Sequence, residues 1–248
     1  MVDDHFDAWI AANYRRLWPH LFEPTVVEPA ADVVAGYAGD GPVLELGIGT
    51  GRLAAAIARR GVHVHGIELS PAMVEVLRAE TSGAIDVTVG DMATARAPGT
   101  YAVVVLVRNT IMNLTTQEQQ VECFRNAAAH LDVGGHFVVE VVVPRWQWLP
   151  PGETLVMFDA SERHVGIDEI DVATQRSWSH HVWRLDGASR RFSAPFRYVW
   201  PSELDLMARL AGLRRVARWA DWTRTPFDAA STGHVSVWVK DPVPAAGG

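Results

Sequence analysis

The chain has 248 residues, 48% of them hydrophobic, and a formal net charge of −7 at pH 7. This length suits one large domain, or one domain with a small insertion, and the acidic charge argues against sequence-independent binding to nucleic acid. Its single cysteine, Cys123, excludes an intrachain disulfide and a cysteine-rich metal site. No apolar run approaches the ~20 residues of a membrane helix, and the acidic N-terminus lacks the features of a signal peptide. We therefore expect a cytoplasmic protein without a membrane partner.

The first 38 residues predict one or two amphipathic helices, broken near Pro19 and Pro24. From residue 40 onward, short apolar runs alternate with helical patterns such as SPAMVEVLRAE and TQEQQVECFRNAAAHL. Strands that alternate with helices of this length indicate βαβ units, and hence a parallel sheet with helices on both faces. The five expected strands are 43–46, 62–69, 85–89, 101–107 and 134–143.

The periodicity changes between Arg145 and Tyr198. Segments such as RSWSHHVWRL alternate apolar and polar residues, and Asp186-Gly187 predicts a turn between two of them. We interpret these segments as antiparallel strands inserted after the fifth parallel strand. A helix from Pro201 and two further strands then complete a seven-stranded sheet. The predicted divisions are a helical lid (1–38), a core (39–144), an antiparallel insertion on the substrate side (145–200), a closing helix with two strands (201–240) and a flexible tail (241–248).

The segment LELGIGTGRLA places three glycines between the first strand and the first core helix. A P-loop requires a lysine, which is absent, and a dinucleotide turn requires glycine where Arg52 stands. The spacing is instead E-x-G-x-G-x-G, made by Glu45, Gly47, Gly49 and Gly51. This pattern resembles motif I of class I S-adenosylmethionine-dependent methyltransferases. We expect the missing Cβ atoms to let a ligand lie directly on this backbone.

Further polar residues stand where the resemblance requires them, at the ends of the next strands. The resemblance implies that Glu68 accepts the ribose hydroxyls of S-adenosylmethionine, that Asp91 accepts from the adenine amino group, and that Arg52 pairs with the ligand carboxylate. It also implies the Rossmann-like α/β fold of this family: a seven-stranded, mostly parallel sheet with helices on both faces, an N-terminal lid and an antiparallel insertion after strand five. The full set of implied cofactor-binding residues is Tyr14, Glu45, Gly47, Gly49, Gly51, Arg52, Glu68, Leu69, Asp91, Met92 and Arg108.

The layout of the chain is similar to small-molecule N-methyltransferases, including those that act on amino sugars of natural products. Enzymes that methylate nucleobases carry a Pro-Pro pair after strand four, whereas residues 108–111 here read R-N-T-I. The resemblance thus implies methyl transfer to an amine or hydroxyl of a small natural-product or sugar-like molecule. Two alternatives stay open: an aminopropyltransferase and a non-catalytic S-adenosylmethionine-binding module. A homo-oligomer also stays open.

Catalytic candidates are residues placed over the carboxyl edge of the sheet. Tyr14 lies in the lid, where related enzymes place a tyrosine near the sulfonium, and His181 lies on an inserted strand as a candidate base. We expect no metal, because no histidine has a carboxylate partner at ligand spacing. The candidate substrate-binding residues are Asn109, Asn113, Trp178, His181 and His234. Tryptophans crowd the insertion and the C-terminal segments, where they could line the roof of the site, pack the core or form a dimer surface: Trp146, Trp148, Trp178, Trp183, Trp200, Trp219 and Trp222.

Overall fold

The computed structural model describes residues 6–144 and 149–242, so that Trp146 and Trp148 lie outside the described residues. Its central sheet has seven strands in the order β10-β11-β5-β4-β1-β2-β3. The five strands from β3 to β5 are parallel, while β11 runs antiparallel to both β5 and β10. The expected Rossmann-like fold is confirmed. The strands are β1 (Val43–Leu46), β2 (Val64–Glu68), β3 (Asp86–Val89), β4 (Tyr101–Leu106), β5 (Leu131–Val142), β10 (Leu213–Trp219) and β11 (Gly233–Lys240).

Helices cover both faces of this sheet, because each parallel crossover deposits its helix on one side. Helices α2 (Pro24–Ala38) and α3 (Arg52–Ala58) pack in one apolar cluster with β1 and β4. Helices α5 (Gln117–His130) and α6 (Pro201–Leu210) pack in the other, around the rings of Phe124, Phe137 and Trp238. None of the helices in the described part has the length and apolar character needed to cross a bilayer.

The segment predicted to form a lid has two parts with different neighbours. Helix α2 packs into the core, since Ala31 and Val34 are fully buried there. Helix α1 (Ala8–Leu17) and the short helix η1 (Pro19–Phe22) instead lie at the edge, where α1 packs against α4 (Pro71–Thr81). Of the predicted lid, α1 and η1 therefore lie over the carboxyl end of the sheet, whereas α2 belongs to the helical layer.

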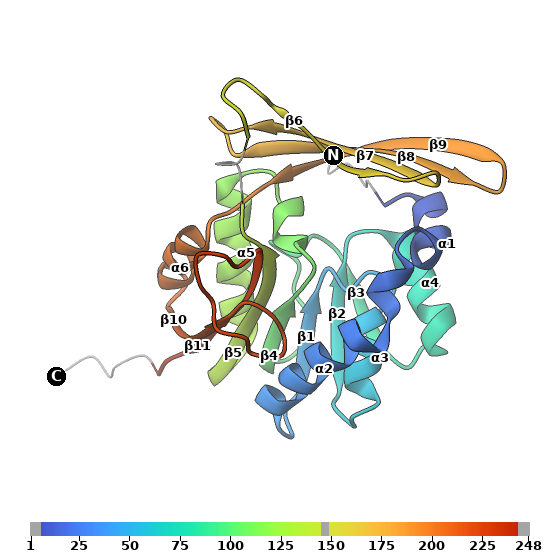
Figure 1. Cartoon of the computed structure of the whole chain (residues 1–248). Helices are drawn as coiled ribbons and strands as arrows, with labels where there is room; N and C mark the ends of the chain where they lie inside the picture. Colours follow the sequence, from blue (N-terminus) through green and yellow to red (C-terminus); the bar gives the residue numbers. More distant parts are fainter. Residues whose placement is uncertain (1–5, 145–148, 243–248) are drawn as a thin grey trace.

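The predicted insertion forms a separate four-stranded antiparallel sheet, which we call the roof. Figure 1 shows the roof spanning the end of the molecule where α1 also lies. Trp183 of the roof is buried against Ile10 and Ala11 of α1 and Met73 of α4. The roof consists of β6 (Leu155–Ala160), β7 (His164–Asp171), β8 (Arg176–Leu185) and β9 (Ala188–Arg197).

Arg197, at the end of β9, fastens the roof to the core. Arg197 is 5% exposed, and its Nη2 lies 2.7 Å from Oε1 of Glu203 on α6. Its guanidinium also donates to Gln120 of α5, whose amide in turn donates to the carbonyls of Ile111 and Leu114. A buried ion pair with further hydrogen bonds holds its geometry well. The roof is thereby held in place beside the loop that follows β4.

Candidate functional site

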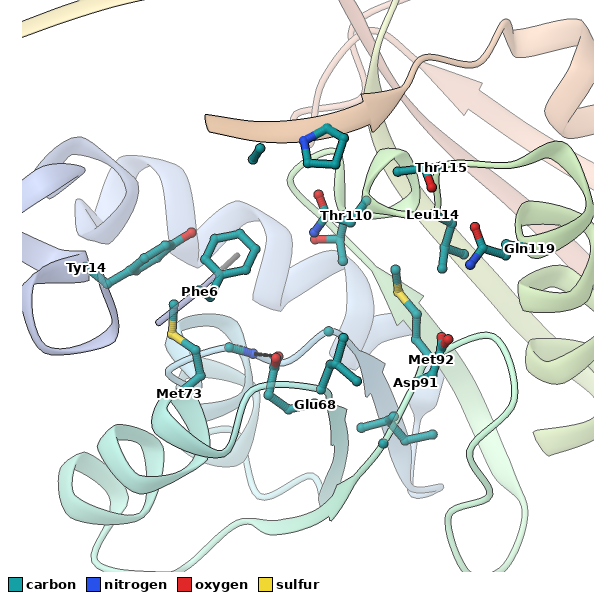
Figure 2. Close-up of a pocket in the computed structure, with 18 of the residues that line it drawn as sticks. Phe6, Tyr14, Glu68, Met73, Asp91, Met92, Thr110, Leu114, Thr115 and Gln119 are labelled. Atoms are coloured by element: carbon teal, nitrogen blue, oxygen red, sulfur yellow. Dashed lines mark hydrogen bonds between the residues drawn. The ribbon is translucent and has the colours of Figure 1, made fainter. Parts of the chain in front are cut away.

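The order of the sheet reverses between β1 and β4, because β2 and β3 extend on one side and β5 on the other. Ligands of open α/β sheets bind at such a reversal, outside the carboxyl ends of the strands. A cavity of about 410 Å³ lies there, between the core strands, α1 and the roof. Figure 2 shows Tyr14 and Glu68 on one side of it and Thr115 and Gln119 on the other. Its lining residues are Phe6, Tyr14, Gly47, Gly49, Ile67, Glu68, Leu69, Met73, Gly90, Asp91, Met92, Thr110, Asn113, Leu114, Thr115, Gln119, Arg176, Ala194 and Pro195.

The three glycines of the turn all have positive φ, but they are needed for different reasons. A Cβ on Gly47 would lie 2.5 Å from the Thr110 methyl group, and one on Gly51 would lie 3.0 Å from Leu77. A Cβ on Gly49 would meet nothing within 4 Å. Only Gly49 therefore offers open space for a ligand beside its backbone. Gly47 also lines the cavity, but there a Cβ would overlap Thr110, and at Gly51 a Cβ would press against Leu77, so packing gives both positions a second reason for glycine.

Glu68 ends β2 and connects three segments around the cavity. Its Oε2 accepts from the backbone N–H of Gly49 at 2.8 Å, and its Oε1 accepts from that of Ser70 at 2.9 Å. The Ser70 hydroxyl donates to the carbonyl of Phe6 at 2.7 Å. The carboxylate is thus held in one orientation by the glycine turn and the start of α4. Glu68 also lines the cavity. A carboxylate has about four acceptor positions for hydrogen bonds.

Asp91, Met92 and Leu69 also line the cavity, as predicted for the cofactor. The Asp91 carboxylate accepts from the backbone N–H of Ala93 at 2.8 Å, which fixes the tight turn after β3. The Met92 carbonyl accepts from the buried amide of Asn126 at 2.8 Å. The first bond is within the turn and the second joins the turn to α5, and together they hold both residues at the cavity wall.

Four of the predicted cofactor residues do not line the cavity: Gly51, described above, and Glu45, Arg52 and Arg108. Glu45 is buried inside β1, and burial raises the pKa of its carboxyl to about 8, so that this group is mostly neutral at pH 7. Arg52 donates to the carbonyl of Leu21 at 3.0 Å and thereby holds η1. Arg108 has a φ of +58° and uses its backbone N–H to bond Glu140. Each of them supports the walls of the cavity from outside in this structure.

Tyr14 projects from α1 into the cavity, within an aromatic group formed by Phe6, Trp18 and Phe22. Burial raises the pKa of the Tyr14 phenol, and the nearby guanidinium groups of Arg108 and Arg52 only partly oppose this rise. The phenol is therefore neutral at physiological pH. It can donate or accept a hydrogen bond, but it does not act as a phenolate base.

Of the predicted substrate residues, Asn113 lines the cavity, whereas Asn109, Trp178 and His234 do not. The Asn109 amide oxygen accepts from the backbone N–H of Val142, because this residue closes the end of the β4–β5 pair. The Trp178 ring stacks with the guanidinium of Arg176. His234 is 1% exposed, and burial lowers the pKa of its imidazole to about 3.

His181, the predicted base, also does not line the cavity. Its Nδ1 bonds Nε2 of His164 at 2.9 Å, its Nε2 bonds the Ser179 hydroxyl at 3.1 Å, and the far side of His164 bonds Asp159 at 2.7 Å. Phe192 stacks on its ring. Burial, followed by His164, lowers the pKa of His181 to about 4. Both ring nitrogens form hydrogen bonds to other residues of the roof, so that His181 lies within the roof and not at the cavity wall.

The tryptophans of the insertion and the C-terminal segments serve packing in the described part of the chain. Trp183 packs on α1, while Trp219 and Trp222 pack against the α2–α3 cluster. Trp200 is 37% exposed. No tryptophan of residues 6–144 or 149–242 lines the cavity, so that, of the three alternatives, packing fits Trp183, Trp219 and Trp222.

Several cavity residues escaped the sequence-based prediction. Thr110, Leu114 and Thr115 lie on the loop after β4, between or beside the two asparagines that the prediction selected. Pro195 lies within β9, which tolerates a proline because it is an edge strand of the roof. A proline inside a predicted strand is the sequence signal that could have indicated this edge position. The remaining additions are Phe6, Ile67, Met73, Gly90, Gln119, Arg176 and Ala194.

Comparison with known proteins agrees with this geometry. A family model for a methyltransferase domain matches residues 43–135. The solved structure of the CcbJ methyltransferase from Streptomyces caelestis is 38% identical, with a TM-score of 0.79, over 86% of this chain and 89% of that one. The curated cypemycin N-terminal methyltransferase from Streptomyces sp is 26% identical over 234 residues, which are 86% of this chain and 95% of that protein.

A third relative shares the fold. CalS10, an amino pentose methyltransferase from Micromonospora echinaspora solved with S-adenosylmethionine bound, is 23% identical with a TM-score of 0.63, over 86% of this chain and 90% of that one. The segment matched by the family model contains the glycine turn, Glu68 and Asp91 together.

Proposed function

The chain belongs to the class I S-adenosylmethionine-dependent methyltransferases, and from this premise we propose that it methylates an amine of a small natural-product or sugar-like molecule. The name of the cypemycin N-terminal methyltransferase supports an amine as the acceptor group. The matched relatives offer no support for aminopropyl transfer or for a non-catalytic module. The acidic net charge of −7 makes a nucleic-acid acceptor unfavourable.

The observation that carries the choice of an amine is the chemistry of the cavity wall. No histidine, lysine or cysteine lines the cavity among the described residues, the Tyr14 phenol is neutral, and the proposal assigns the two carboxylates of the wall, Glu68 and Asp91, to the cofactor. A hydroxyl acceptor requires a base to remove its proton, whereas a neutral amine already carries a lone pair. Positioning and exclusion of water can then provide most of the acceleration, with ~7–11 kcal/mol available from proximity.

The residues of the chain have separate roles in this proposal. Glu68 and Asp91 hold the ribose and the adenine of the cofactor, and the open space at Gly49 accommodates its nearby atoms. When bound, S-adenosylmethionine supplies an electrophilic methyl group on a sulfonium. Tyr14 and Asn113 orient the acceptor by hydrogen bonds. Helix α1 and the roof exclude water from the cavity.

The test compares matched acceptors that differ in one atom. The protein is incubated with S-adenosylmethionine and either an amino sugar or the parent sugar, and formation of S-adenosylhomocysteine and methylated product is measured. We expect turnover only with the amine. Turnover that requires the hydroxyl and proceeds equally without the amine would contradict the proposal.

A further inference from the structure

Arg176, the first residue of β8, lines the cavity from the roof and is exposed at its mouth. The charged residues of the described lining are Glu68, Asp91 and Arg176. Glu68 ends β2 and Asp91 follows β3, both in the core, while Arg176 belongs to the roof. Arg176 is thus the single cation among the described residues that line this cavity.

The carboxylates nearest to Arg176 in the sheet form their hydrogen bonds with other groups, although Asp171 is close enough for the Arg176 charge to help lower the pKa of its carboxyl. Its cross-strand partner on β7 is Asp171, whose carboxylate bonds the backbone N–H of Ala173 and the hydroxyl of Thr174. Its partner on β9 is Arg197, which takes the carboxylate of Glu203. Within the described part of the chain, the Arg176 guanidinium has no carboxylate oxygen within 4.0 Å.

A contact with Trp178 holds this guanidinium without neutralising it. The Arg176 Cζ lies 4.9 Å from the centroid of the indole ring, a distance at which the ring attracts a cation. Two neutral donors of the same cavity, Asn113 and Thr115, form no side-chain hydrogen bond to other described residues. The cavity therefore combines an oriented, unpaired guanidinium with uncommitted hydrogen-bond donors.

An unpaired cation at this position gives no electrostatic attraction to a simple amine, whose reactive form is neutral. It favours an acceptor that brings a negative charge of its own, because the planar guanidinium matches the two oxygens of a carboxylate or phosphate. We propose that Arg176 binds an anionic group, a carboxylate or a phosphate, on the acceptor. This inference rests on the proposed amine methylation. Taken together, the two make the acceptor a molecule that carries both an amine and an anionic group.

The test measures binding to the complex with S-adenosylhomocysteine by calorimetric titration. Two matched pairs of amines serve as probes: L-proline with L-prolinamide for the carboxylate, and glucosamine 6-phosphate with glucosamine for the phosphate. We expect the anionic member of at least one pair to bind about 10- to 100-fold more tightly. The pair that shows this preference identifies which anion the site takes.

Arg176→Gln is the test variant, and Arg191→Gln is its matched control, an exposed arginine on β9 that does not line the cavity. We expect Arg176→Gln to bring the two members of the pair to within about twofold, and Arg191→Gln to keep the wild-type ratio. Differences in amine basicity within a pair are the same for all three proteins. Affinity for S-adenosylhomocysteine should be unchanged in both variants.

Three results would overturn the proposal: neutral members that bind wild type as tightly as their anionic partners in both pairs, a ratio that survives in Arg176→Gln, or no binding of either anionic member at about 10 mM. Failure of the proposed function looks different. A protein that binds the anionic members through Arg176 but methylates no amine would contradict amine methylation and leave the anion site intact.

Discussion

The Glu68 carboxylate accepts a hydrogen bond from the backbone N–H of Gly49 at 2.8 Å, so the end of β2 and the glycine turn after β1 are joined beneath the cavity. The second oxygen of Glu68 is bonded to the start of α4. One side chain thus holds two of the segments that surround the cofactor cavity. The contact explains why a carboxylate, with acceptors on both oxygens, stands at this position.

Substitution of Glu68 should impair cofactor binding far more than folding. In Glu68→Ala, the Gly49 N–H loses its acceptor in free and bound protein alike, whereas the ribose hydroxyls lose theirs only on binding, and each unsatisfied hydroxyl costs ~1–3 kcal/mol of binding free energy. We expect the Kd for S-adenosylhomocysteine to rise at least about 100-fold in calorimetric titration. Glu75→Ala, on the exposed face of α4, is the control and should bind like wild type. Equal affinity in Glu68→Ala and its control would place the cofactor elsewhere.

The glycines of the turn should separate into a binding residue and a packing residue. Both alanine variants carry the strain of a positive φ, but Gly49→Ala adds no side-chain overlap, so it should lose less stability than Gly47→Ala and should lower cofactor affinity. Gly47→Ala places its Cβ against the Thr110 methyl group and should lower the melting temperature more, since overpacking costs ~1–3 kcal/mol. Adding Thr110→Ser, which removes that methyl group, should restore stability to Gly47→Ala only. Rescue of both variants, or of neither, would contradict this assignment.

Tyr14→Phe should reduce kcat without destabilising the fold. The Tyr14 hydroxyl has no hydrogen-bond partner among the described residues, so its removal leaves no protein group unsatisfied. We expect kcat to fall ~10- to 100-fold, the range for loss of one positioning group. Because burial keeps the phenol protonated, the pH–rate profiles of wild type and variant should be parallel between pH 7 and 9. A slope that disappears in the variant would show that Tyr14 titrates during catalysis.

His181 should make the protein sensitive to acid. Its pKa falls from 6.5 to about 4 on folding, so the unfolded chain binds more protons between these values. Its contribution to stability is complete above pH 6.5 and is lost as the pH falls toward 4, by up to about 1.4 kcal/mol per unit. His181→Gln should reduce the slope of the unfolding free energy against pH by up to one proton. His234, whose pKa is lowered to about 3, provides a similar slope that remains in this variant.

A control distinguishes titration of His181 from loss of its hydrogen bonds. His180→Gln changes the neighbouring histidine, which bonds Ser193 and Glu169 near the surface. This variant should keep most of the acid-side slope of wild type, because burial and His164 precede His180 among the causes that lower the pKa of His181. Chemical denaturation at several pH values between 4 and 7 measures both. An unchanged slope in His181→Gln would contradict the assigned cause.

The sequence by itself determined the order of the elements and the cofactor end of the site. Glu68 and Asp91 each follow a short apolar run, and a parallel sheet brings the carboxyl ends of such runs to one edge. Neither inference needs distances, because strand ends and chain order are local properties. The change of periodicity after Arg145 likewise predicted the antiparallel roof, since alternation with a period of two is visible in the residues themselves.

Only the tertiary structure decided which side chains face the cavity. Alternation along β8 leaves open which face of the roof meets the core, and the orientation follows from contacts with α1, as at Trp183. His181 lies on the same face of β8 as Trp183. Its ring nitrogens form hydrogen bonds with His164 and Ser179, and no pattern within β8 predicts a partner on β7. The presence of Arg176 in the cavity lining also depends on tertiary contacts. The position of the roof is set by Arg197, Gln120 and Glu203, which are far apart in the sequence.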